Sequence, residues 1–117
     1  MDKDELLKQA KDRFSFMQRN KIEKAIDFAS VKHNGQLRAS GEPYITHPLS
    51  VASILIDWQV DLDSVIAAIL HDTLEDTDTT LQEIEDNFGK NIAFLIDGVT
   101  KVSAARKGMR EIKSYLP

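Results

Sequence analysis

The chain has 117 residues, a length suited to one domain with a single modest hydrophobic core. Hydrophobic residues make up 42% and charged residues 29%, a composition typical of soluble globular domains that excludes a disordered tail. Because cysteine is absent, disulfides and thiolate metal sites are excluded, and we expect a cytoplasmic protein. The longest apolar run is Val65–Leu70, so we expect neither a signal peptide nor a membrane partner.

Charge is distributed unevenly along the chain, although the formal net charge is only −4. Residues 39–89 carry eleven Asp and Glu and no Lys or Arg, whereas residues 1–38 and 90–117 have net charges of +3 and +4. The carboxylates of this central acidic segment must be solvated, used as helix caps, or balanced by a cation from outside the chain. Since the chain lacks a broad basic face, we expect no DNA partner.

The spacing of apolar residues is helical throughout and predicts an all-α fold. Gly and Pro predict an ordered loop over residues 36–46. Either Asp61 or Asp63 can cap the fourth helix, and Thr80 with Glu83 forms a capping box that opens the fifth. In chain order, the six expected helical segments cover about residues 2–16, 20–33, 47–58, 62–75, 81–89 and 90–102.

The last residues, 103–117, have few apolar side chains and an excess of basic ones. This composition is typical of a basic linker or a frayed end. The other interpretation is that the chain is cut at this point inside a longer protein. The apolar stripe of the sixth helix itself predicts that the helix ends near Val102.

The fourth expected helix carries titratable side chains on one face. At about 100° per residue, His71, Asp72, Glu75 and Asp76 share one arc, opposite the apolar side. Three carboxylates at the negative end of a helix dipole repel one another, and a bound cation would offset this. A histidine nitrogen and a carboxylate oxygen, as His71 and Asp72 provide, suit Mn²⁺, Fe²⁺ or Zn²⁺. Glu75 and Asp76, one turn further on, could then orient or deprotonate a metal-bound water. The alternative is a solvated acidic helix end with a core histidine.

His47, at the expected entrance of the third helix, is a third candidate ligand.

Four strings in this order and spacing resemble a known family. They are GQLRASGEPYITHP at Gly35–Pro48, LHDTLEDT at Leu70–Thr77, Phe88–Gly89, and DGVTK at Asp97–Lys101. Together they resemble the N-terminal HD hydrolase domain of the RelA/SpoT family, the bifunctional synthetase/hydrolases of the alarmone (p)ppGpp. The resemblance covers about residues 20–102 and implies an HD-superfamily helical bundle, here incomplete at its C-terminus.

The resemblance also implies a reaction and roles for five residues. The family removes pyrophosphate from the 3′ position of guanosine tetra- or pentaphosphate, with one Mn²⁺ bound in the domain. His47, His71 and Asp72 match the first three metal ligands of the family. Glu75 and Asp76 match the pair assigned to activating the attacking water, and both are present here.

The nucleotide contacts and the last ligand depart in part from the family pattern. Arg38 matches a loop arginine that contacts the bound nucleotide, but the neighbouring position, often basic in the family, is Ala39. The fourth family ligand is an Asp on a later helix, which has no counterpart before Pro117. We therefore expect this chain to be inactive or weakly active by itself. If later helices normally cover its core, exposed apolar surface should also make it self-associate.

Two other functions stay open at this point. The chain could be a non-catalytic regulatory or nucleotide-binding HD module that controls a synthetase domain. Alternatively, it could be an HD phosphohydrolase that acts on another nucleotide. The intact Glu75 and Asp76 pair favours hydrolysis in the longer protein, and the missing fourth ligand favours a regulatory role for this chain alone.

Overall fold

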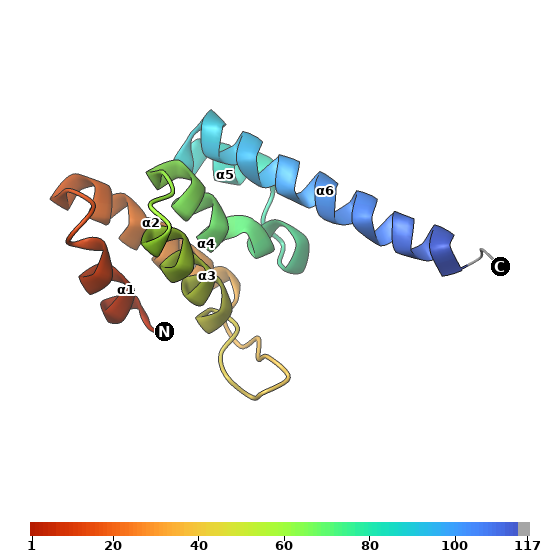
Figure 1. Cartoon of the computed structure of the whole chain (residues 1–117), viewed down its shortest axis with the longest axis horizontal. Helices are drawn as coiled ribbons and strands as arrows, with labels where there is room; N and C mark the ends of the chain where they lie inside the picture. Colours follow the sequence, from red (N-terminus) through yellow and green to blue (C-terminus); the bar gives the residue numbers. More distant parts are fainter. Residues whose placement is uncertain (115–117) are drawn as a thin grey trace.

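Six helices form the regular structure of the protein, which is described by a computed structural model covering the backbone of residues 1–114 and the side chains of residues 1–110. They are α1 (Lys3–Ala10), α2 (Phe16–Lys32), α3 (Thr46–Asp57), α4 (Leu62–Asp76), α5 (Leu81–Phe88) and α6 (Lys90–Ser114) (Figure 1). Within the described residues, strand-like pairing is limited to one isolated antiparallel bridge between Leu37 and Pro43. The all-α fold predicted from apolar spacing is confirmed.

The boundary between the first two helices differs from the prediction because of a capping box that the apolar spacing does not reveal. Ser15 Oγ accepts a hydrogen bond from the backbone N–H of Gln18 at 3.2 Å, and Gln18 Oε1 accepts one from the Ser15 N–H at 2.9 Å. This reciprocal pair satisfies two backbone donors at the start of a helix. The prediction of one helix over residues 2–16 was therefore wrong: α1 ends at Ala10, and α2 begins at Phe16.

The starts of α4 and α5 follow the predicted caps. Asp61 accepts hydrogen bonds from the backbone N–H and hydroxyl of Ser64, at 3.2 and 2.7 Å, and is the N-cap of α4. Asp63 instead accepts a hydrogen bond from Asn91 at 2.7 Å. Thr80 accepts one from the N–H of Glu83 at 3.1 Å and caps α5, as predicted.

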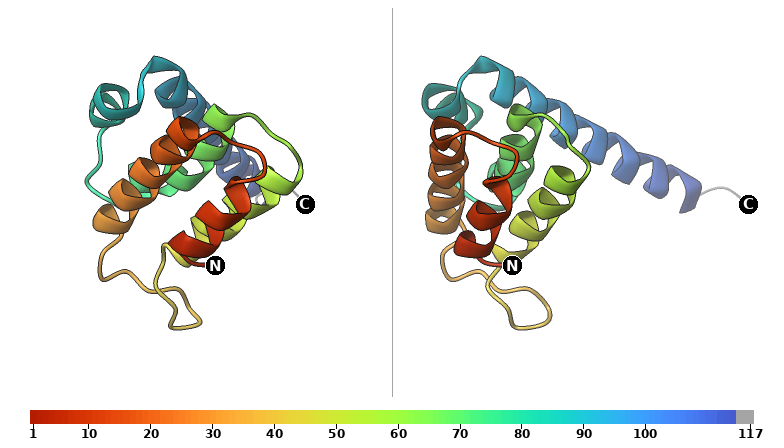
Figure 2. Two further views of the ribbon diagram at one scale, coloured as in Figure 1. Left: turned by 90° about the vertical axis from the view of Figure 1, so that its left-hand side faces the viewer. Right: turned by 60° about the vertical axis from the view of Figure 1, so that its left-hand side comes forward.

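The sixth helix is much longer than predicted. It runs to Ser114, so the prediction that it ends near Val102 in a linker was wrong for residues 103–114. This segment is rich in Ala, Arg, Lys and Met, which favour helix even without an apolar stripe. Residues 115–117 lie outside the described residues. The second half of α6 projects away from the other helices (Figures 1 and 2). No helix in the described residues is long and apolar enough to cross a membrane.

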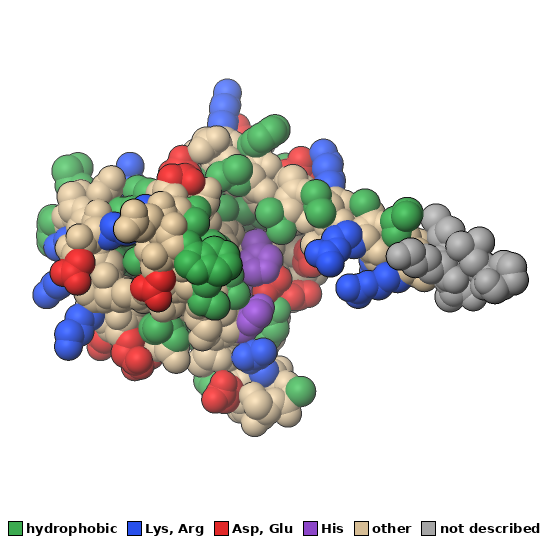
Figure 3. Space-filling model, in the orientation of Figure 1, with side chains coloured by type: hydrophobic (Ala, Val, Ile, Leu, Met, Phe, Trp, Pro, Cys, Tyr) green, Lys and Arg blue, Asp and Glu red, His purple; other side chains and the backbone are tan. Residues whose placement is uncertain are grey.

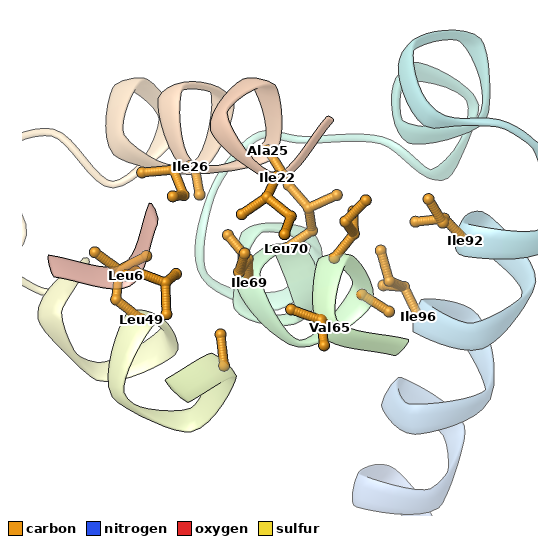
Figure 4. Close-up of a cluster of buried hydrophobic side chains, with 14 of the residues drawn as sticks. Leu6, Ile22, Ala25, Ile26, Leu49, Val65, Ile69, Leu70, Ile92 and Ile96 are labelled. Atoms are coloured by element: carbon orange, nitrogen blue, oxygen red, sulfur yellow. The ribbon is translucent and has the colours of Figure 1, made fainter. Parts of the chain in front are cut away.

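The core is built around α4, which contacts α2, α3 and α6. The apolar run Val65–Leu70 of α4 is buried apart from the half-buried Ala68, as predicted for a central helix. Figure 4 shows apolar side chains of the neighbouring helices gathered around it. The labelled core residues are Leu6 of α1, Ile22, Ala25 and Ile26 of α2, Leu49 of α3, Val65, Ile69 and Leu70 of α4, and Ile92 and Ile96 of α6. Because its first half is fixed in this core, α4 holds the polar residues of its second half in place.

Candidate metal and hydrolase site

The candidate site lies where the C-terminal half of α4 meets the start of α3 and the loop before it. His71 and Asp72 belong to α4, and His47 is the second residue of α3, followed by the buried Pro48. A proline in the first helical turn has a suitable φ and needs no N–H partner, which helps to fix the start of α3 beside α4. Figure 3 shows histidine and acidic surfaces side by side where α6 leaves the body of the molecule.

The His71 ring is fixed by contacts at both nitrogen atoms. Its Nδ1–H donates a hydrogen bond to the carbonyl oxygen of Ala68 at 2.6 Å, so Nδ1 carries a proton. Its Nε2 lies 3.0 Å from Oδ1 of Asp72. The hydrogen bond to Asp72 raises the pKa of His71, although burial acts in the opposite direction. Nε2 is therefore the nitrogen that faces the site.

Asp72 is the most enclosed acid of the site, with a side chain only 11% exposed. Its Oδ2 accepts a hydrogen bond from the Tyr44 hydroxyl at 2.9 Å and lies 4.0 Å from Nε2 of His47. Burial alone would raise the pKa of Asp72, but the hydrogen bond and positive charge of His71 outweigh it and lower that pKa. Asp72 thus lies between the two histidines.

The two acids that follow are more exposed. Tyr44 OH also lies within hydrogen-bonding distance of Asp76 Oδ2, at 3.3 Å, which connects this acid to Asp72. Glu75 is exposed, and its charge contributes to the raised pKa of His71. The shared helix face predicted for these residues is therefore observed. The sequence did not indicate Tyr44, because nothing in its local spacing marks a tyrosine 28 residues before Asp72 as a partner.

Arg38 lies at the exposed end of the loop that precedes α3. Its backbone N–H donates to the carbonyl oxygen of Glu42 and its own carbonyl accepts from the Gly41 N–H, both at 2.8 Å. Gly41 has a φ of 89°, a conformation that favours glycine and closes this turn. Among the described residues, no hydrogen bond or ion pair links the Arg38 side chain to the histidines or to Asp72. The structure therefore leaves the Arg38 side chain exposed to solvent, and Ala39 beside it is exposed too.

The three predicted ligands lie near one another but do not form a closed cation site. In the described part of the chain, no three His, Cys, Asp or Glu side chains are close enough to hold a metal ion as they stand. The donor chemistry nevertheless fits a divalent ion. Since Nδ1 of His71 carries a proton, a neutral ring directs its Nε2 lone pair at the Asp72 carboxylate. That contact is repulsive unless a proton or a metal ion lies between the two atoms, so the pair suits a shared cation.

Comparison with known proteins is consistent with this geometry. Residues 25–114 match the family described as HD domain. The chain belongs to the HD-domain family. It is 48% identical over 94 residues to a guanosine-3′,5′-bis(diphosphate) 3′-pyrophosphohydrolase of Aquifex aeolicus, covering 80% of this chain and 14% of that protein. It is 53% identical over 70 residues to the bifunctional (p)ppGpp synthase/hydrolase SpoT of Escherichia coli, covering 60% of this chain and 10% of that protein.

A solved structure shares the fold of this HD-domain protein. It belongs to a metazoan ortholog of SpoT that is described as hydrolysing ppGpp, with a TM-score of 0.62 and 32% identity. The match covers 66% of this chain and 46% of that one. The resemblance to RelA/SpoT proteins inferred from the motifs is therefore confirmed. This HD-domain chain spans only 14% and 10% of the lengths of the two bacterial relatives above.

Proposed function

We propose that this HD domain is part of a metal-dependent hydrolase that releases pyrophosphate from the 3′ position of ppGpp or pppGpp. The observation that carries the proposal is the position of Asp72 between His71 and His47, 3.0 and 4.0 Å away. The names of the relatives support the substrate class. Water would attack the 3′-diphosphate at phosphorus, and cleavage of the bond to the ribose 3′ oxygen would leave a hydroxyl and pyrophosphate.

The metal would be held by His47, His71 and Asp72, and Mn²⁺ suits this mixture of nitrogen and oxygen donors. When bound, such an ion supplies Lewis-acid polarisation of the phosphate and lowers the pKa of a coordinated water. Glu75 and Asp76 provide exposed carboxylates beside these ligands that can accept the proton of the attacking water. The acidic surface would otherwise repel a highly charged nucleotide, which makes a bound cation electrostatically necessary.

Nucleotide binding is assigned to Arg38, whose planar guanidinium can pair with phosphate oxygens or stack on the guanine base. Its exposed position on the loop leaves its donors free for a ligand. Ala39 provides no second cation at the neighbouring position. A fourth metal ligand would come from a longer protein, so we propose weak or no turnover by the 117-residue chain alone. A cytoplasmic location, suggested by the cysteine-free composition, stays a prediction.

The proposal is tested with a panel of nucleotides. In the longer protein, Mn²⁺ should support pyrophosphate release from ppGpp and pppGpp, and GDP and GTP should be left intact. Phosphorus-31 NMR or chromatography of the products measures the release. The 117-residue chain should give a small fraction of that rate. Equal cleavage of other nucleotides would instead indicate an HD phosphohydrolase of different specificity. Robust turnover by the short chain would contradict the need for a further ligand.

A regulatory role is the second candidate, and one observation favours it. The three ligand candidates do not surround a metal ion as they stand within the described residues. If the domain only binds nucleotide to control a synthetase, ppGpp should bind to the longer protein without pyrophosphate release, with or without Mn²⁺. Calorimetry run in parallel with the hydrolysis assay separates the two functions.

Self-association is the proposed behaviour of the chain in solution. Phe94, Val102 and Met109 of α6 are 75, 60 and 56% exposed, an unusual concentration of large apolar side chains on one helix. Burying them between two copies would remove this surface from water. Light scattering should therefore give a mass above 13.2 kDa that rises with concentration. A constant monomer mass would overturn this part of the proposal.

A further inference from the structure

The Tyr44 hydroxyl occupies a position between two carboxylates of the candidate site. It lies 2.9 Å from Oδ2 of Asp72 and 3.3 Å from Oδ2 of Asp76. These acids are four residues apart on α4, where like charges repel, and the negative end of the helix dipole adds to the repulsion. A phenol has a single proton to donate, so the two carboxylates share one donor. The shorter distance indicates that Asp72 receives it for most of the time.

Two histidine rings pack against the ring of Tyr44. The His33 ring lies against it with centroids 4.7 Å apart and a tilt of 33°. The His47 ring lies at a steep angle to it, with centroids 6.1 Å apart. His33 is 3% exposed and forms the C-cap of α2, so the support comes from a helix anchored in the core. The orientation of the Tyr44 hydroxyl is thus set by packing and not only by its hydrogen bonds.

Gln36 connects this support to the end of α4. Its backbone carbonyl accepts a hydrogen bond from the Tyr44 N–H at 2.9 Å, and its Nε2 donates to the carbonyl oxygen of Asp76 at 3.0 Å. Its Oε1 lies 3.0 Å from Nδ1 of His33, which must donate because an amide oxygen only accepts. The loop, α2 and α4 therefore meet at Tyr44 through direct contacts.

These contacts leave the two oxygens of Asp72 with different partners. Tyr44 holds Oδ2, while Oδ1 faces Nε2 of His71, the pair of atoms suited to a shared cation. Without the phenol, Oδ2 of Asp72 would lose its hydrogen bond, and the carboxylate would be held mainly by the contact of Oδ1 with His71. The hydroxyl would also no longer lie between Asp72 and Asp76 to reduce the repulsion between them. Partners that orient a ligating carboxylate contribute strongly to metal affinity.

We propose that Tyr44 is a positioning residue that fixes the rotamer of Asp72 for cation binding and keeps Asp76 beside it. This inference rests on the proposed function for the identity of the ligands. It adds a residue that acts through Asp72 and not on the substrate. It also gives His33 and Gln36 a role, because His33 packs against the Tyr44 ring and the Gln36 carbonyl holds the Tyr44 backbone.

The test is Tyr44→Phe in the 117-residue chain, which keeps the ring and its packing but removes the hydroxyl. Mn²⁺ affinity, measured by calorimetry or by the electron paramagnetic resonance signal of free Mn²⁺, should fall about 10- to 100-fold. Thr46→Val is the matched control, because the Thr46 hydroxyl donates a hydrogen bond to the Pro43 carbonyl oxygen at 2.8 Å and, in the described part of the chain, makes no hydrogen bond to either acid. It should leave Mn²⁺ affinity unchanged. Circular dichroism melting checks that both variants fold.

A second variant, Asp76→Asn, tests how Tyr44 would support Mn²⁺ binding. If Tyr44 acts partly by offsetting the repulsion between the two acids, Asp76→Asn should reduce the effect of Tyr44→Phe on Mn²⁺ affinity. In the longer protein, Tyr44→Phe should lower kcat at limiting Mn²⁺ and recover most of it at saturating Mn²⁺, with the KM for ppGpp little changed. A merely structural role would give no such recovery. Unchanged Mn²⁺ affinity in Tyr44→Phe would overturn the proposal.

A measurement without metal separates this inference from the proposed function. Scalar couplings in NMR spectra should report one χ1 rotamer for Asp72 in the unchanged chain and averaging in Tyr44→Phe. A single rotamer in both proteins would contradict the positioning role, whatever the metal data. If the unchanged chain and the longer protein both fail to bind Mn²⁺, the proposed function fails, and the couplings still decide whether Tyr44 orients Asp72.

Discussion

His71→Ala and Asp72→Ala should each lower the Mn²⁺ affinity of the domain, and pyrophosphate release by the longer protein, by more than about 100-fold. His71 offers only Nε2 to a cation, because its Nδ1–H is held by the Ala68 carbonyl. Asp72 is the acid closest to both histidines and largely enclosed, so no neighbouring carboxylate can replace it. Calorimetry with Mn²⁺ and a pyrophosphate assay with ppGpp measure the two losses.

Asp78→Ala is the control for this experiment. Asp78 lies two residues beyond the end of α4, and its side chain is 91% exposed. Among the residues whose side chains are described, it pairs with Lys32 alone, at 3.5 Å. Exposed ion pairs of this kind contribute little to stability. Its removal takes away one negative charge near the site without touching a proposed ligand. Undiminished activity in either His71→Ala or Asp72→Ala, or an equal loss in Asp78→Ala, would refute the proposed ligand set.

Leu70→Ala should lower the free energy of unfolding by about 2–5 kcal/mol. Leu70 is fully buried in the core around α4 (Figure 4). Truncation to alanine loses apolar burial and leaves a cavity that the packed helices fill only in part. Urea unfolding followed by circular dichroism gives the change. Because Leu70 directly precedes His71, a weaker Mn²⁺ affinity should accompany the loss of stability.

Leu37→Ala provides the matched comparison, since Leu37 is 66% exposed in the loop before α3. The same chemical change at this position should alter stability by no more than about 0.5 kcal/mol. Similar losses in the two variants would mean that Leu70 does not occupy the core position described here.

Much of the helical architecture could be predicted because it depends on local spacing. The apolar positions of α4 and the caps Asp61 and Thr80 act within a few residues, and both caps are observed. The errors were local as well. The capping box of Ser15 and Gln18 starts α2 at Phe16, inside the segment predicted as the first helix, and helix-forming residues extended α6 beyond the end of its apolar stripe. In both places, capping and propensity outweighed apolar periodicity.

The candidate site was predictable where its members share a helix. His71, Asp72 and Asp76 occupy one face because each residue turns about 100° around α4. His47 was a candidate because of its place at the entrance of the third helix, and the resemblance made it the first ligand. Its distance of 4.0 Å from Asp72 is a result of how α3 packs on α4. Tyr44 was not predicted at all. The catalytic and substrate-binding roles of Glu75, Asp76 and Arg38 stay predictions for the experiments above.

The sequence by itself determined that residues 39–89 are strongly acidic, and that several of these acids face one way on a helix. The tertiary structure decided which acids are compensated. Lys32 of α2 reaches Asp78 and Glu83, at 3.5 and 3.2 Å, although it lies far from both in sequence. Asp72 becomes enclosed between Tyr44 and the two histidines. Helix periodicity fixes which residues share a face, but the distance between residues on different helices depends on how those helices pack, and no local pattern encodes that distance.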